Sequence, residues 1–306
     1  MNHHPGAWGQ TLTPHQRFDA YSSSAPSRYQ PSTSGSGIVG NGNDHGFYDA
    51  PGGNEAVMAG GVVGHTQQPL VTGTSVLGLV FADGVMLAAD NLASYGSLAR
   101  FRDIQRLIPL ESSKHSSSCL AVGGDMSDFQ YLQKQLETMI INERTQALGD
   151  DHPSLGPVQI YEYLSNLMYA RRSKMDPLWN AMLLGGVKDG ESFLGYVDLL
   201  GTTYTSPTLA SGFGSHMAQP LLREAYEKRQ AQGKSGEREG ELMSRDEAVA
   251  VLEDCMKVLY YRDARSMNKY QIATITAQGV DISASKSNET EWKFAEGLRG
   301  YGPQKQ

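Results

Sequence analysis

The order in which strand-like and helix-like patterns follow one another is the strongest constraint on how this chain can fold. Short apolar runs bounded by turn residues predict strands, and apolar residues spaced three and four apart predict helices. The strand patterns form three hairpins and two single strands, at residues 75–81 with 85–89, 181–187 with 193–199, 271–276 with 280–283, 107–110 and 118–122. The helix patterns fall at residues 125–148, 158–172 and 216–230, and after Ser244, which has Glu247 at capping-box spacing. Because strands and helices occupy separate blocks, we expect an α+β fold with stacked sheets and helices outside.

The first 65 residues have the composition of a disordered segment. They contain 28 Gly, Ser, Pro or Asn residues but only eight Leu, Ile, Val or Phe residues. Such a segment buries too little apolar surface to offset the entropy lost when it is ordered. We therefore expect a disordered leader or propeptide over residues 1–65, followed by one folded domain.

Charge and composition exclude several classes of function. The chain has 26 Lys or Arg against 33 Asp or Glu, a net charge of -7 that argues against a nucleic-acid partner. No apolar run approaches the ~18 residues of a membrane span, and no secretory signal pattern opens the chain. Five of the eight histidines lie in the leader and the others are far apart, so we expect no metal ion and no cofactor.

Cys119 and Cys255 are the two cysteines of the chain. Two thiols can form neither a disulfide framework nor a four-ligand zinc site. Both lie in apolar stretches, which predicts buried, inert thiols and suits a reducing compartment.

Arg171, Arg172 and Lys174 form a basic cluster at the end of the second predicted helix. A short basic run of this kind is compatible with a nuclear-localisation patch. Cations at a helix end also suit the helix dipole, and we favour a solvated or interface patch.

Several stretches of the sequence resemble those of proteasome β-type subunits. Residues 72–78 and 84–90 read TGTSVLG and GVMLAAD, and later stretches agree: RRSKMDPLWN at 171–180 and ESFLGYVDLLG at 191–201. The specific runs are SYGSLARF at 94–101 and YYRDARS at 260–266. The resemblance covers residues 66–290 as a domain and leaves 291–306 as a C-terminal arm. It implies the N-terminal-nucleophile hydrolase fold, a four-layer αββα sandwich with two antiparallel sheets between helix layers.

The resemblance also implies a set of site positions. In active members of this family, a threonine exposed by cleavage after glycine attacks with its hydroxyl, and its own α-amine, with a pKa of about 8, is the base. Thr74 occupies the nucleophile position in this chain, directly after Gly73. Four further residues match site positions of the family: Asp90, Gly124, Asp263 and Ser266. Gly124 stands at the position of the glycine that binds the oxyanion.

Two positions depart from the family pattern. The family's lysine position, 32 residues after Thr74, holds Arg106. Arginine is always protonated and presents a planar five-donor fork, so it does not replace a compact ammonium beside the hydroxyl. A serine that supports the terminal amine in the family is Phe213 here, and its ring is expected to fill that space without offering a hydrogen bond. These departures predict a degenerate site without catalysis.

The residues from Thr66 onward resemble a processed start within the family. This implies cleavage between His65 and Thr66 by a neighbouring active subunit, and a retained flexible tail is the alternative. Cleavage there leaves eight residues ahead of Thr74, which then has no free α-amine.

The resemblance therefore implies a non-catalytic, structural β subunit of the 20S proteasome core, acting in ubiquitin- and ATP-dependent protein degradation in the cytoplasm and nucleus. Its expected partners are the β subunits at the sixth and first positions of the same ring, α-ring subunits and assembly chaperones. The arm, with Trp292 and Phe294, is expected to reach the first and second β subunits of the opposite ring and to help half-particles join. Two alternatives stay open: an active threonine endopeptidase using Thr74, and a free-standing binding protein with this fold.

Overall fold

A computed structural model describes the chain over residues 68–113, 116–146, 155–233 and 242–293. The predicted leader 1–65, the predicted cleavage site at His65 and Thr66, and Phe294 of the arm lie outside these residues. The described part belongs to one compact unit.

The smaller sheet has five strands in the described chain and is built on two of the predicted hairpins. Its order is β11-β2-β3-β12-β13, with every neighbouring pair antiparallel. At Gly84, the first residue of β3, a Cβ atom would stand 2.0 Å from the carbonyl oxygen of Ile275 in β12, so β3 and β12 pair this closely only with glycine at that position. The strands are β2 (Val76–Phe81), β3 (Gly84–Asp90), β11 (Thr208–Ala210), β12 (Tyr270–Thr276) and β13 (Gly279–Ile282).

The larger sheet has eight strands among the described residues. Its order is β10-β9-β8-β7-β1-β4-β5, and β6 pairs with β7 beside this path. All of its pairs are antiparallel. The strands are β1 (Val71–Gly73), β4 (Ala93–Tyr95), β5 (Leu98–Phe101), β6 (Leu107–Ser113), β7 (Ser116–Asp125), β8 (Asn180–Lys188), β9 (Glu191–Val197) and β10 (Thr203–Thr205).

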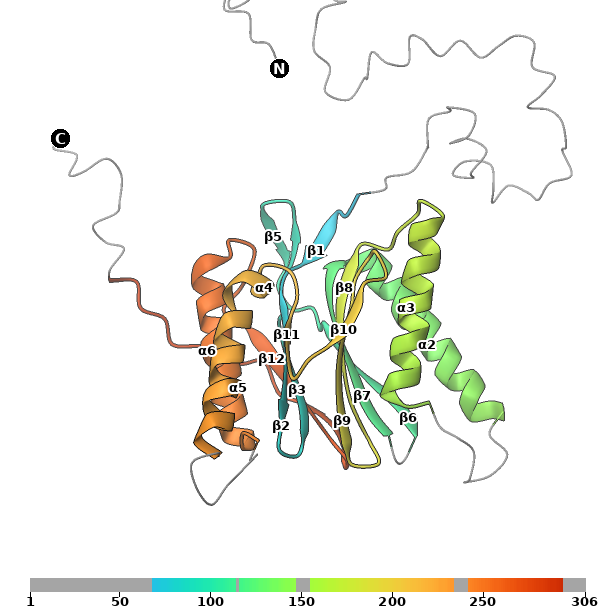
Figure 1. The fold of residues 1–306 in the computed structure, drawn as a ribbon. Coiled ribbons are helices and arrows are strands. Elements are labelled where there is room, and N and C mark those ends of the chain that lie inside the picture. Colours follow the sequence, from blue (N-terminus) through green and yellow to red (C-terminus); the bar gives the residue numbers. More distant parts are fainter. Residues whose placement is uncertain (1–67, 114–115, 147–154, 234–241, 294–306) are drawn as a thin grey trace, which may run out of the picture. The chain divides into compact units, whose positions relative to one another are not determined.

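Helices cover the outer faces of the two sheets (Figure 1). The short α4 (Gly214–Met217) with α5 (Gln219–Gly233) and α6 (Arg245–Arg262) packs on the smaller sheet, and α2 (Met126–Gln146) with α3 (Pro157–Ser173) packs on the larger one. Each helix layer shares an apolar cluster with its sheet. A third cluster, which includes Leu87, Leu183 and Ile275, fills the space between the sheets. The predicted four-layer αββα sandwich is therefore confirmed.

The predicted hairpins and three of the four predicted helices are confirmed to within a few residues. Ser244 caps α6 as expected: its hydroxyl accepts the Glu247 N–H at 3.4 Å, and the Glu247 carboxylate accepts the Ser244 N–H at 2.9 Å. Asp125 precedes α2, and its carboxylate accepts the N–H groups of Ser127 at 2.8 Å and Asp128 at 3.2 Å in the first turn.

The prediction of one helix over residues 216–230 is wrong. The structure has two helices, α4 and α5, with Ala218 between them. Pro220 explains the break, because proline has no N–H to donate to the carbonyl of His216 and disfavours helical backbone in the residue before it. Proline is accepted in the first turn of a new helix, and α5 begins there.

The sequence patterns did not indicate five of the strands: β1, β4, β5, β10 and β11. Each has three or four residues, which is too short for an alternating pattern to show. Two of them, β1 and β4, turn out to bear directly on the site.

Three expectations from composition can be compared with the described residues. Cys119 and Cys255 are both unpaired and buried, as predicted. No described helix is long and apolar enough to cross a membrane. Within the same ranges, His, Cys, Asp and Glu side chains do not gather into a group able to hold a metal ion.

Candidate functional site

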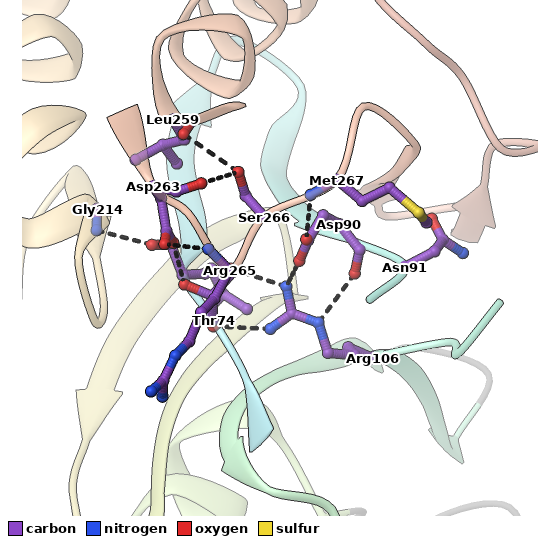
Figure 2. A network of polar contacts seen from close by, with 12 residues as sticks. Thr74, Asp90, Asn91, Arg106, Gly214, Leu259, Asp263, Arg265, Ser266 and Met267 are labelled. Atoms are coloured by element: carbon purple, nitrogen blue, oxygen red, sulfur yellow. Dashed lines mark hydrogen bonds and ion pairs between the residues drawn. The ribbon is translucent and has the colours of Figure 1, made fainter. Parts of the chain in front are cut away.

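Arg106 lies just before β6 with its side chain buried between the two sheets, 1% exposed. Its guanidinium donates to five oxygen atoms. Figure 2 shows its contacts with Thr74 and Asp90. Nε donates to the Asp90 carbonyl at 2.9 Å, and Nη1 donates to the carbonyls of Thr74 at 2.8 Å and Val122 at 3.2 Å. Nη2 donates to the Ser75 carbonyl at 3.0 Å and forms an ion pair with the Asp90 carboxylate.

These contacts join the two sheets at one end of the sandwich. Thr74 and Ser75 link β1 of the larger sheet to β2 of the smaller one, Asp90 ends β3 of the smaller sheet, and Val122 belongs to β7 of the larger sheet. A planar fork with five N–H groups can serve this set of acceptors at once, whereas an ammonium has three. Arg106 is therefore a cross-link between sheets.

Gly73 and Gly123 leave room for this arrangement. A Cβ atom at Gly73 would stand 2.7 Å from Cδ of Arg106, and one at Gly123 would stand 2.8 Å from the carbonyl oxygen of Thr74. Both distances are shorter than a Cβ atom tolerates to a neighbouring heavy atom, so the backbone of β1 and β7 can approach Arg106 and Thr74 this closely only with glycine at these positions.

Asp90 is buried beside Arg106, 2% exposed. Its second carboxylate oxygen accepts the backbone N–H of Met267 at 3.1 Å. Burial raises the pKa of the Asp90 carboxyl to about 6, and the positive charge of Arg106 limits that rise.

The Thr74 hydroxyl donates a hydrogen bond to the carboxylate of Asp263, which lies at the C-terminal end of α6. The other oxygen of that carboxylate accepts the N–H of Arg265 at 2.9 Å. The Ser266 hydroxyl donates to the Asp263 carbonyl at 2.8 Å and so fixes the turn after the helix. Thr74 on one side and Asp263 with Ser266 on the other, predicted from two distant parts of the sequence, therefore meet (Figure 2).

The residues before Thr74 are built into the larger sheet. Strand β1 pairs with β4, with Thr72 opposite Ser94, and with β7, with Gly73 opposite Gly124. Upstream of the strand, the N–H of Leu70 donates to the Asp125 carboxylate at 2.8 Å. In the full-length chain the nitrogen of Thr74 is thus a peptide nitrogen that follows an interior strand.

A cleft of about 330 Å³ opens beside Thr74. Its lining includes Gly124, whose backbone has φ +95° and whose Cβ would stand 2.0 Å from the Trp179 carbonyl oxygen. The predicted oxyanion glycine therefore does lie at the cleft, next to the predicted nucleophile. The remaining lining residues are Thr72, Gly73, Gly123, Trp179, Asn180, Ala181, Leu199, Ser211, Gly212 and Arg265.

Phe213 lies in the turn after β11, next to the cleft. Its neighbour Gly212 lines the cleft, whereas the Phe213 ring does not and is 38% exposed. The turn is held by Ser75, whose hydroxyl accepts the N–H of Gly214 at 2.7 Å. The structure brings Phe213 to the region that the sequence indicated but leaves its ring outside the cleft lining.

Sequence reasoning missed two residues that shape the cleft. The buried side chain of Asn180 donates to the carbonyls of Gly123 at 3.1 Å and Asp125 at 2.9 Å. The Ser211 hydroxyl accepts the N–H of Val76 at 3.2 Å. Asn180 ends the run RRSKMDPLWN, so its place in a family-like stretch was the available signal, whereas Ser211 had none.

The stacked sheets, the outer helix layers and a threonine facing an acidic residue beside a glycine-walled cleft define the class of N-terminal-nucleophile hydrolase folds. A family model for proteasome subunits matches residues 70–275. The chain is 46% identical over 252 residues to proteasome subunit beta type-4 of Xenopus laevis, covering 82% of this chain and 97% of that one. It is 44% identical over 248 residues to proteasome subunit beta type-7 of Saccharomyces cerevisiae (79% and 88% covered) and 40% identical over 230 residues to proteasome subunit beta type-4 of Arabidopsis thaliana (75% and 85% covered). The chain belongs to the proteasome subunit family.

We expect Arg106→Lys to destabilise the chain by about 3 kcal/mol or more, because a lysine leaves at least two of the five buried acceptors without a donor. Chemical denaturation of the full chain measures this free energy of unfolding. Arg102→Lys is the matched control: Arg102 is exposed and its Nε donates to one carbonyl at 3.4 Å, so the change is expected to stay within about 0.5 kcal/mol. Equal effects of the two substitutions would contradict the cross-link.

Asp90 makes stability depend on pH in a defined direction. Its pKa in the folded chain, about 6, lies above the ordinary 3.8, so the folded chain binds this proton more tightly than the unfolded chain. The contribution of Asp90 is therefore fully present below pH 3.8 and is lost as the pH rises through about 6. We expect the free energy of unfolding, measured relative to Asp90→Asn, to fall by up to ~3 kcal/mol over this range. A difference that grows with pH would show that attraction to Arg106 outweighs desolvation.

Proposed function

We propose that this chain is a non-catalytic, structural β subunit of the 20S proteasome core, which acts in ubiquitin- and ATP-dependent protein degradation. The observation that carries the proposal is the placement of β1. This strand ends at Gly73 and lies between β4 and β7 inside the larger sheet. A free amine on Thr74 requires the chain to be cut directly after this strand.

Such a cut would disturb the larger sheet. Strand β1 is the element that pairs β4 to β7, and β5 in turn pairs with β4. Cutting after Gly73 removes the covalent tether of β1 to Thr74 and leaves a three-residue strand to hold this edge of the sheet by hydrogen bonds alone. If the role of the subunit is to form a rigid wall of the particle, a β1 that stays covalently attached to Thr74 keeps this edge of the sheet in place.

The charges around Thr74 support the same proposal. Arg106 stands at the family's lysine position, but each of its contacts goes to a backbone carbonyl or to Asp90 rather than to the Thr74 hydroxyl. The hydroxyl itself donates to Asp263. A nucleophilic threonine needs an acceptor that takes its proton at neutral pH, and in this family that acceptor is the amine that β1 masks.

The alternative, a threonine endopeptidase using Thr74, is favoured by one specific observation. Thr74 and Gly124 do line the same cleft, and Asp263 contacts the hydroxyl. The alternative requires cleavage between Gly73 and Thr74 and a working site without the lysine.

The described start of the C-terminal arm supports a role for the arm in the joining of half-particles. Trp292 packs edge-on against Tyr260 and Tyr261 of α6, with ring centroids 6.0 and 5.2 Å apart. The Glu291 N–H donates to the Tyr261 hydroxyl at 2.8 Å, and Asn288 is held by Asn268 and Tyr270. These contacts fix the point from which the arm leaves the domain.

We also propose specific partners for this subunit within the particle. Membership of the family implies assembly with other proteasome α and β subunits. We assign the sixth and first β positions of the same ring as neighbours, assembly chaperones as transient partners, and the first and second β subunits of the opposite ring as the targets of the arm.

We further propose that residues 1–65 are a leader removed between His65 and Thr66 by a neighbouring active subunit, and that the particle works in the cytoplasm and nucleus. The two buried, unpaired thiols suit a reducing compartment.

Thr74→Ala tests the absence of catalysis. We expect particles that carry it to keep every peptide-hydrolysing activity, measured per particle, because no reaction step uses the hydroxyl. A covalent threonine-directed probe should leave this chain unlabelled in wild-type particles. Thr74→Ser is the matched variant, since it retains a hydroxyl. If one activity disappears in Thr74→Ala and persists in Thr74→Ser, Thr74 is a nucleophile and the alternative holds.

Deletion of residues 292–306 tests the arm. We expect half-particles to accumulate and their joining to slow, because the deletion removes both the Trp292 contact and the segment beyond it. Pulse labelling followed by native electrophoresis measures the joining rate. Trp292→Phe, which keeps an aromatic ring against α6, is the control and should join at nearly the wild-type rate. Normal joining after the deletion would remove this role.

A further inference from the structure

The turn after α3 places a methionine where helices usually have glycine. The N–H of Asp176 bonds to the Arg171 carbonyl at 3.1 Å and the N–H of Met175 bonds to the Arg172 carbonyl at 3.1 Å. This pair of bonds is the Schellman motif, in which the residue after the helix cap adopts left-handed backbone. Met175 is that residue, with φ +58°.

A methionine in this conformation is unfavourable for the isolated domain. Left-handed backbone costs a residue with a Cβ roughly 1 kcal/mol or more relative to glycine. In the described chain, the other non-glycine residue with positive φ is Asp189, a type that tolerates this backbone. Met175 gains no burial in return, because its side chain is 78% exposed.

The residues around Met175 are held in a fixed arrangement. Arg171 forms an ion pair with Asp176 at 2.9 Å and stacks over the ring of Tyr131. Arg172 stacks over the ring of Tyr169, which is 56% exposed. An ordered tip needs little further ordering when it binds, which favours affinity.

The chemistry of this tip points to one kind of partner. Exposed methionine, tyrosine and arginine are the residue types enriched in the centres of protein interfaces. Three cations and one carboxylate give the tip a local charge opposite in sign to the chain's -7. Lys174 has no carboxylate partner among the described residues. A complementary surface therefore offers an apolar pocket for Met175 with carboxylates at its rim.

We propose that the α3 tip, formed by Tyr169, Arg171, Arg172, Lys174 and Met175, is a contact with another subunit of the particle, and that Met175 is its anchor. The partner surface is an apolar pocket rimmed by acidic side chains. The tip lies at the same end of the sandwich as β1 (Figure 1). Of the function proposed above, the inference uses only the membership of the proteasome subunit family, so it holds whether or not Thr74 is catalytic.

Met175→Gly separates binding from folding, because the two effects have opposite signs. The substitution relieves the left-handed backbone, so thermal unfolding of the full chain should occur at the same or a higher temperature. Cells that produce equal amounts of tagged variant and untagged wild type then reveal assembly. We expect the variant-to-wild-type ratio in purified particles to be about tenfold below the ratio in the unassembled pool, as for loss of an anchor residue.

Asp189→Gly is the matched control, because it relieves the same backbone in the β8–β9 turn, outside the tip. It should enter particles at the wild-type ratio. Met175→Asn, which also tolerates left-handed backbone, should fail as Met175→Gly does. Lys174→Glu should reduce incorporation and Lys174→Arg should not. Wild-type incorporation of Met175→Gly would overturn the proposal. So would a Lys174→Glu variant that assembles normally but is lost from the nucleus, which would identify the basic cluster as a localisation signal.

Discussion

The buried guanidinium of Arg106 is the interaction on which this end of the molecule depends. Two sheets that pack face to face can slide or splay where their strands end, and here the ends of β1, β3 and β7 converge on one cation. A buried cation is tolerated only when its donors are satisfied and its charge is paired. Four carbonyl contacts and the carboxylate of Asp90 meet both conditions. In return, the cation fixes the backbone at Thr74 and Ser75.

The Arg106 cross-link occupies the family's lysine position, and other residues of the family's reaction centre keep their places around it. Thr74 still faces Asp263, and Gly124 still lines the cleft beside it. In the chain that is not cut after Gly73, the nitrogen of Thr74 belongs to a peptide, and the donors of Arg106 are occupied by the Asp90 carboxylate and four carbonyls. The Thr74–Asp263 hydrogen bond also ties the start of β2 to the end of α6, which is the structural role that our proposal gives to these polar groups.

The sequence predicted those features that local patterns encode. Short apolar runs bounded by tight turns predicted the hairpins, and the spacing of Ser244 and Glu247 predicted the start of α6. Strands of three residues, such as β1, carry no periodicity, so their pairing depends on the larger strands around them. The five contacts of Arg106 were hidden for a similar reason, since its acceptors come from distant segments. Pro220 did carry a signal for the break between α4 and α5, which the apolar spacing masked.

The central claim is that Thr74 stays inside the chain in the working particle. Intact mass and N-terminal sequencing of this subunit, taken from native particles, test it most directly. The account predicts a mature chain that begins upstream of Gly73, with Thr66 as its first residue, so that β1 remains attached. A mature chain that begins at Thr74 would expose a threonine amine, release β1 and contradict the account.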